Sequence, residues 1–128
     1  MKIIQACLRE MENESNSNYE REILGFLLVH AVGRANAKTW DVISEGVQRS
    51  IGISHNKNHF QNGLLKRSRE SDFFIGSTDA KPAGYFIIDT LTDAQEMERW
   101  YLQRIATETS RLNHLHSLMF QAINQNTP

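Results

Sequence analysis

Residues 39–69 read TWDVISEGVQRSIGISHNKNHFQNGLLKRSR and predict two helices joined by a tight turn. In the first half, apolar residues recur at helical spacing, at Trp40, Ile43, Val47 and Ile51. Gly52 ends this helix, because glycine readily adopts the left-handed conformation that follows helix ends. Ser54 is placed to cap a second helix from His55 to about Arg69. The inner face of that second helix has three apolar residues, Phe60, Leu64 and Leu65.

The same stretch has the most uneven charge in the chain. The 128 residues include fourteen basic and fifteen acidic side chains, yet no Asp or Glu lies between Gly46 and Arg69. This acid-free window contains five Lys or Arg and two His residues, which are Arg49, Lys57, Lys66, Arg67, Arg69, His55 and His59. A nearly neutral chain that separates its charges in this way has a positive region. We expect that region to lie on the second predicted helix.

Positive charge interleaved with Asn and Gln is typical of a helix that binds double-stranded DNA, because these amides can bond phosphates and read adenine. The alternative is a solvated helix face that lacks acids by chance. On the DNA-binding interpretation, helix 55–69 enters the major groove. Its candidate base contacts are Asn56, Lys57, Asn58, His59, Asn62 and Lys66. Three further cations, Arg49, Arg67 and Arg69, would hold phosphates.

Before this stretch, the sequence predicts two more helices. Residues 1–11 form a short amphipathic helix, and the polar loop after it ends in an N-cap at Ser17 or Asn18. Residues 19–32 have apolar side chains around most of a helix, including Phe26 and His30 on one face, so we expect this helix to be buried.

After it, residues 73–76 and 84–88 are aromatic and β-branched and predict a hairpin around a turn at 77–83. Thr92 and Gln95 fit a capping box that opens a helix of about thirty residues. The fold class is therefore mainly α with a β-hairpin, that is, α+β. We expect one domain, with an N-terminal arm at 1–18, a core at 19–90 and a long helix at 91–123.

Three segments, Leu64–Arg67, Phe73–Ser77 and Gly84–Ile88, resemble small winged helix-turn-helix DNA-binding proteins of phages and other mobile elements. In that family the recognition helix leads into a Gly-Ser turn and a Gly-Tyr-Phe strand, and a long helix follows. The resemblance covers about residues 37–110 and implies a transcriptional regulator or a DNA-processing accessory factor. The chain departs from the family pattern at Gln48, where a small residue is usual.

The resemblance also implies a role for the hairpin loop, which docks beside the recognition helix and reaches the neighbouring groove or backbone. Lys81 would contact a phosphate, and Ser77 and Thr78 would be weaker donors. Asp79 would oppose close approach of a phosphate, and an ordinary exposed turn is the alternative.

The long C-terminal helix predicts a homodimer, because its apolar residues recur close to heptad spacing. Four of them lie beyond the expected reach of the core, namely Leu112, Leu115, Leu118 and Met119. The alternative is a monomer in which this helix folds against residues 1–11 and 19–32.

Composition and motifs argue against several other classes. A net charge of −1 excludes a generally polycationic chain, and apolar runs of about six residues are too short to cross a membrane. The single cysteine, Cys7, cannot form an intramolecular disulfide, which favours the reducing cytoplasm.

His55 and His59 have a metal-binding spacing, but a catalytic zinc site needs a third ligand and usually a carboxylate base. No phosphate-binding loop or nucleophile motif occurs in the sequence. We therefore expect a DNA-binding protein with no catalytic activity, metal or cofactor. The main alternative is a protein-interaction adaptor or structural component, and a metal-dependent nuclease ranks below both.

Overall fold

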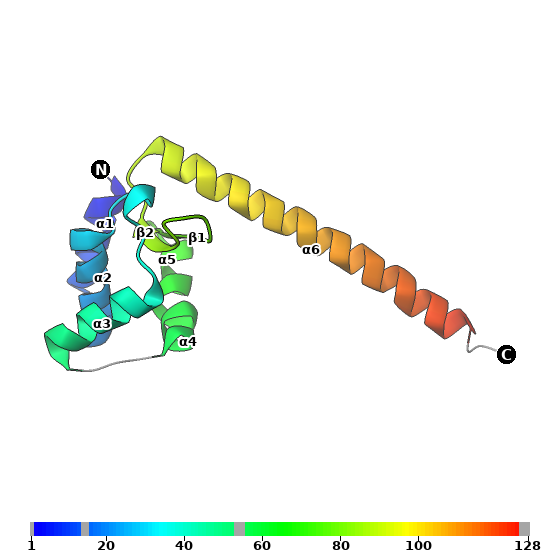
Figure 1. Cartoon of the computed structure of the whole chain (residues 1–128), viewed down its shortest axis with the longest axis horizontal. Coiled ribbons are helices and arrows are strands. Elements are labelled where there is room, and N and C mark those ends of the chain that lie inside the picture. The colour runs from blue at the N-terminus through cyan, green and yellow to red at the C-terminus, as the bar shows by residue number, and fades with distance from the viewer. Residues whose placement is uncertain (1, 14–15, 53–55, 126–128) are drawn as a thin grey trace. The chain divides into compact units, whose positions relative to one another are not determined.

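A computed structural model describes residues 2–13, 16–52 and 56–125 of the chain. It is mainly helical, with a two-stranded antiparallel hairpin and a long C-terminal helix, which confirms the α+β class (Figure 1). The chain divides into two compact units, Met1–Ala94 and Gln95–Pro128. No helix among the described residues is both long enough and apolar enough to cross a membrane.

In its described residues, the first unit contains three helices, a hairpin and one interrupted helix. The regular elements are α1 (Lys2–Met11), α2 (Asn18–His30), α3 (Trp40–Ile51), β1 (Ile75–Thr78) and β2 (Gly84–Ile87). A short 3-10 turn covers Arg34–Asn36. The interrupted helix runs from α4 (Lys57–Phe60) through a π-helical turn (Gln61–Leu65) into α5 (Lys66–Arg69). We call it the α4–α5 helix; the remaining element is α6 (Leu91–Gln125).

The α4–α5 helix packs on the core through the face that the sequence predicts. Phe60, Leu64 and Leu65 are all buried. The Phe60 ring stacks on Trp40 and meets the Tyr85 ring edge-on, with centroids 4.9 Å apart in each case. The opposite face of this helix is therefore the one left for other molecules.

The hairpin is tied to the segment that leads into α3. Ile75 pairs with Ile87 and Thr78 with Gly84, so β1 begins and ends two residues later than predicted. On the other edge of β2, Lys38 and Tyr85 exchange two backbone hydrogen bonds of 3.0 and 2.8 Å. Gly84 has a φ of +126°, and a Cβ there would lie 2.0 Å from the Lys38 carbonyl oxygen. Only glycine fits so close to the Lys38 backbone.

Several predicted helix ends are confirmed. Ser17 caps α2 in a reciprocal capping box with Glu20. The first helix of the 39–69 stretch is present as α3, and its cap is Thr39. Gly52 ends α3 in the left-handed conformation with a φ of 71°. Ser54 and His55 lie outside the described residues, and the side chain of Asn56 caps the α4–α5 helix.

The predicted cap of the C-terminal helix is wrong. The helix begins at Leu91, and its cap is Thr90 rather than Thr92, since the Thr90 hydroxyl accepts from the Asp93 backbone N–H at 3.1 Å. The buried Asp93 carboxylate also accepts from the backbone N–H groups of Arg34 and Asp89. These contacts hold Asp93 in the first turn and so select Thr90.

Gln48, where the chain departs from the family pattern, is exposed. The small residue where α2 and α3 approach closely is Gly46. A Cβ there would lie 2.3 Å from the Phe26 ring.

The prediction that His30 lies on a buried face is wrong as well. His30 is exposed at the end of α2, where its ring lies 4.7 Å from that of Phe26.

Candidate nucleic-acid interface

The outer face of the α4–α5 helix brings together most of the predicted base contacts. All of the exposed side chains between residues 57 and 69 are polar or basic, and they are Lys57, Asn58, His59, Asn62 and Lys66. Asn58, Asn62 and Lys66 follow one another at four-residue intervals, which places them along one side of a helix. We call the side that carries Asn58, His59, Asn62 and Lys66 the outer face.

A shallow hollow of about 350 Å³ lies on the outer face. It is lined by Asn56, Asn58, His59, Asn62 and Gly63. The side-chain oxygen of Asn56 already accepts from the His59 backbone N–H at 2.8 Å, so Asn56 serves mainly as the helix cap. The side chains of Asn58 and Asn62 make no hydrogen bond to any described residue and border the same hollow.

The cations of the acid-free window divide into exposed and anchored groups. Lys57 and Lys66 are exposed, and neither ammonium forms an ion pair with a described residue. Arg67, by contrast, points away from the outer face and lies 2.6 Å from a carboxylate oxygen of Glu20. It also donates to the side-chain oxygen of Asn16 at 2.9 Å. Lys66 and Arg67 are neighbours in sequence, yet only Arg67 forms an ion pair with a described residue.

The Glu20–Arg67 contact is an anchor between α2 and the α4–α5 helix. Burial of the Glu20 carboxyl would raise its pKa, but the hydrogen bond and charge of Arg67 and the hydrogen bonds from Ser17 outweigh that effect. The pKa of Glu20 therefore lies below its ordinary value. The ionised pair fixes the end of the helix from its inner side, whereas the sequence assigns Arg67 to a phosphate.

The two other predicted phosphate-binding arginines also have contacts within the protein. Arg69 donates to the Ser77 hydroxyl at 2.9 Å and so joins the end of the α4–α5 helix to β1. Arg49 lies on α3, where it forms an exposed ion pair with Glu45 one turn away. The charge of Arg49 is largely balanced by Glu45, whereas the Ser77 hydroxyl that Arg69 contacts is neutral.

The hairpin loop presents Lys81 at the surface beside Asp79, and both residues are exposed. Its backbone is held by Arg34, whose guanidinium donates to the carbonyls of Ala80 and Pro82, each at 3.3 Å. Sequence reasoning missed this role of Arg34, because no local pattern connects residue 34 with a loop more than forty positions away. The contact fixes the shape of the loop that carries Lys81.

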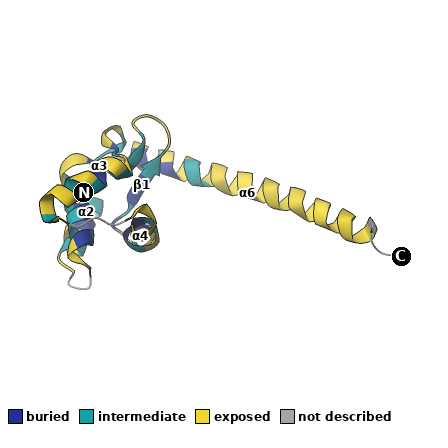
Figure 2. Ribbon diagram, turned by 60° about the horizontal axis from the view of Figure 1, so that its bottom comes forward, coloured by how far each residue is buried: buried dark blue, intermediate teal, exposed yellow. Residues whose placement is uncertain are grey.

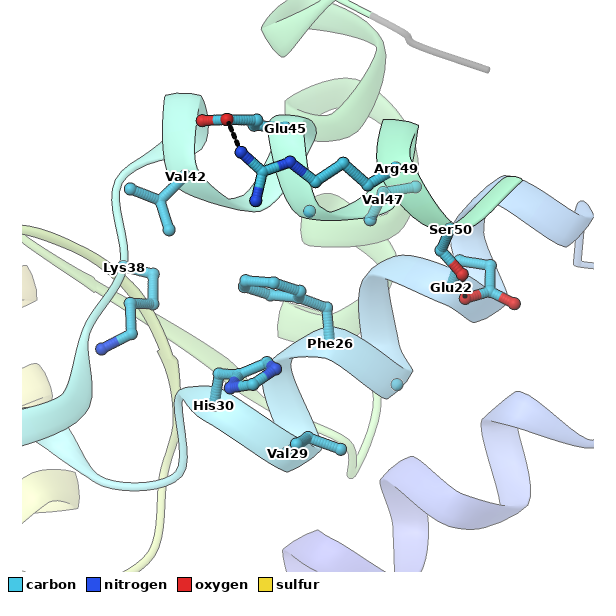
Figure 3. A pocket seen from close by; sticks show the side chains of 12 residues that line it. Glu22, Phe26, Val29, His30, Lys38, Val42, Glu45, Val47, Arg49 and Ser50 are labelled. Carbon is cyan, nitrogen blue, oxygen red and sulfur yellow. Dashed lines mark hydrogen bonds and ion pairs between the residues drawn. The ribbon is translucent and has the colours of Figure 1, made fainter. Parts of the chain in front are cut away.

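A separate groove of about 620 Å³ lies between α2 and α3. Figure 3 shows Phe26 reaching from α2 toward α3 at the centre of its labelled side chains. Val29 and Val42 border the groove and are 75% and 45% exposed. The charged residues on its edge are mixed in sign and comprise Glu22, Lys38, Glu45 and Arg49. This groove suits an apolar side chain rather than a polyanion.

The structure brings together no metal-binding cluster of three or more His, Cys, Asp or Glu residues within 2–13, 16–52 and 56–125. The predicted pair of His55 and His59 is not described as a pair, because His55 lies outside these ranges. Comparison with protein families, with curated proteins and with solved structures gives no match for the chain.

Proposed function

We propose that this protein is a non-catalytic double-stranded DNA-binding protein with a winged helix-turn-helix fold. The α4–α5 helix would lie in the major groove, and the β1–β2 hairpin would be the wing. One observation supports this proposal above the others: the outer face is exposed, free of acids and built from amide, imidazole and ammonium groups. Such groups bond both phosphates and base edges.

Four cations would contact phosphates on this interpretation. Lys57 and Lys66 lie on the α4–α5 helix, Arg69 lies at its end next to β1, and Lys81 lies in the loop. Arg67 and Arg49 contribute less, because Glu20 and Glu45 balance their charges. Binding would be general or sequence-selective, in a transcriptional regulator or a DNA-processing accessory factor that works in the cytoplasm.

We further propose that two copies associate through the end of α6. Its large apolar residues are between 49% and 64% exposed, and they are Leu112, Leu115, Leu118, Met119, Phe120 and Ile123 (Figure 2). Covering the exposed half of such side chains on both copies would contribute about 10–18 kcal/mol. That contribution is comparable with the roughly 4–15 kcal/mol cost of association. A dimer would also hold two DNA-binding helices in one particle and raise the effective affinity.

The test is the salt dependence of binding to random duplex DNA. Neutralising about four phosphates per bound copy gives a slope near −3.6 per copy in a plot of log affinity against log salt concentration. The double variant Lys57→Ala, Lys66→Ala should reduce that slope to about −1.8 and lower affinity for all sequences alike. Arg99→Ala is the matched control, since it removes an exposed charge from α6. Undetectable duplex binding at low salt would contradict the proposal.

The second candidate function is a protein-interaction adaptor. It is favoured by the α2–α3 groove, where Val29 and Val42 leave apolar surface open to solvent. An adaptor would keep its partner when Lys57 and Lys66 are replaced, and it would lose it when Val29 is changed to Asp. The two functions are therefore separable by variants on different elements.

A further inference from the structure

We propose that the outer face reads adenine, with Asn58 and Asn62 as the residues that determine specificity. The protein would then prefer duplexes that contain two A·T pairs one or two steps apart. The inference rests on the proposed DNA-binding function and names the sequence class that it would select.

The carboxamides of Asn58 and Asn62 are both available to bond another molecule. Asn58 and Asn62 are exposed, border one hollow and make no hydrogen bond to a described residue. A free carboxamide offers one acceptor and two donors, which match the N6 amino group and N7 of adenine in the major groove. Both groups are therefore in a state to bond a base edge without first breaking an internal contact.

Two other amides near this helix already form hydrogen bonds within the protein. Gln61 donates to the Tyr85 hydroxyl at 3.1 Å, and the oxygen of Asn56 caps the helix. A bidentate contact to adenine needs both the donor and the acceptor of one carboxamide. Gln61 and Asn56 are therefore poorer readers than Asn58 and Asn62.

The outer face offers fewer side chains that suit the other bases. Guanine is most often read by arginine or lysine, but Arg67 is bound to Glu20 and Asn16, and Arg69 is bonded to Ser77, so Lys66 is the guanine reader left on the outer face. Cytosine is read by a carboxylate acceptor, and residues 46–69 contain none. Adenine is thus the base whose usual partner, a carboxamide, occurs twice on the outer face without an internal hydrogen bond to a described residue.

The spacing of the two readers sets the spacing of the two A·T pairs. Residues four apart on a helix are separated by about 6 Å along its axis. Successive base pairs are separated by about 3.4 Å along DNA. A helix that follows the groove would place Asn58 and Asn62 about two base-pair steps apart, and an inclined helix would place them one step apart.

The experiment is selection of binding sites from a random duplex library with the full-length protein. We expect A·T pairs to be enriched at two positions, one or two steps apart. Asn58→Ala should abolish the preference at one position and Asn62→Ala at the other, each by about 5- to 100-fold. Asn124→Ala, an exposed asparagine on α6, is the matched control and should select the same site as the unchanged protein.

A second measurement tests the contact from the DNA side. Replacing each selected adenine by 7-deazaadenine removes the N7 acceptor, so it should weaken the unchanged protein and leave the corresponding Ala variant unaffected. A library from which no duplex is retained at low salt would contradict DNA binding itself, and the inference with it. A retained pool without paired A·T enrichment, or one that both Asn variants also select, would overturn the adenine assignment alone.

Discussion

The outer face of the α4–α5 helix and the last turns of α6 are both exposed and both free of acids, yet they differ in their basic and apolar side chains. The outer face presents amides, an imidazole and Lys66. Residues 112–125 of α6 have no Lys, Arg, Asp or Glu, and six large apolar side chains there are about half exposed. The first surface has the chemistry for a polyanion, and the second has the chemistry for another apolar surface.

An absence of acidic residues from a stretch of sequence does not by itself predict a positive surface. The contacts of the remaining side chains must also be known. Residues 46–69 contain cations and no acids, but two of these cations form ion pairs with acids elsewhere in the protein. Arg67 binds Glu20 from another helix, and Arg49 binds Glu45 within its own. In residues 112–125 the absence of all four charged types leaves an apolar surface.

The largest expected effect breaks the apolar side of this comparison. We expect the double variant Leu112→Asp, Leu115→Asp to convert a dimer into a monomer, because association would bury four new carboxylates. Sedimentation should show the mass halved, and duplex affinity should fall by about 100-fold because the second binding site is lost. Asn113→Asp, an exposed neighbour in the same turn, is the control and should stay dimeric. An unchanged protein that sediments as one chain would favour the folded-back monomer instead.

The next effect separates two neighbours on the polar side. Lys66→Ala should lower duplex affinity about tenfold at 0.1 M salt and reduce the salt slope by about 0.9, because it removes one phosphate contact. Arg67→Ala should leave the slope nearly unchanged and instead lower the free energy of unfolding, since it leaves Glu20 without its partner. Fluorescence titration and urea unfolding measure the two quantities. An equal loss of slope in both variants would show that Arg67 also reaches DNA.

A smaller effect is the pH dependence of the anchor. The pKa of Glu20 is lowered in the folded protein from an ordinary value of 4.5, so its ionisation stabilises the fold above pH 4.5. That stabilisation is lost as the pH falls through the lower folded pKa. Because Arg67 is 41% exposed, we expect Glu20→Gln to cost about 1–2 kcal/mol at pH 7 and less at pH 3.

Glu45→Gln is the control for the anchor, since the exposed pair of Glu45 with Arg49 should contribute less than about 0.5 kcal/mol at either pH. Chemical unfolding at the two pH values measures both variants. A loss for Glu20→Gln that does not change between pH 7 and pH 3 would argue against a charge effect.

The smallest effect is expected in α1, where the apolar surface is covered. Burial, with smaller contributions from the charges of Asp72 and Glu10, raises the pKa of the Cys7 thiol to about 12. A thiol reagent at pH 8 should therefore leave the folded protein unmodified and react fully after unfolding. Rapid modification of the native protein would mean that α1 opens readily.

Local sequence signals predicted helix ends well where residues within one helical turn determine them. Ser17 with Glu20, Thr39 before α3 and Gly52 after it each act within a few residues. Contacts between distant residues account for the errors. Thr90 is the cap in place of Thr92 because Asp93 meets the backbone of Arg34, and His30 is exposed although the apolar pattern of its helix predicted burial.

In the candidate site, too, local features were predicted and contacts between distant residues were not. Helical periodicity predicted which residues of 57–69 face the core and which face outward. It gave no indication that Arg67 binds Glu20 and Asn16, because those partners lie 47 and 51 positions away. The role of Arg34 in holding the hairpin loop was likewise hidden from any pattern in the sequence.

Asn16 joins the first helix to the proposed reading helix, since its amide group bonds Glu10 through the nitrogen and Arg67 through the oxygen. Replacing Asn16 would remove one of the two acceptors that hold Arg67 and would break the link from α1 to the α4–α5 helix. The orientation of the proposed reading helix therefore depends in part on one buried asparagine outside it.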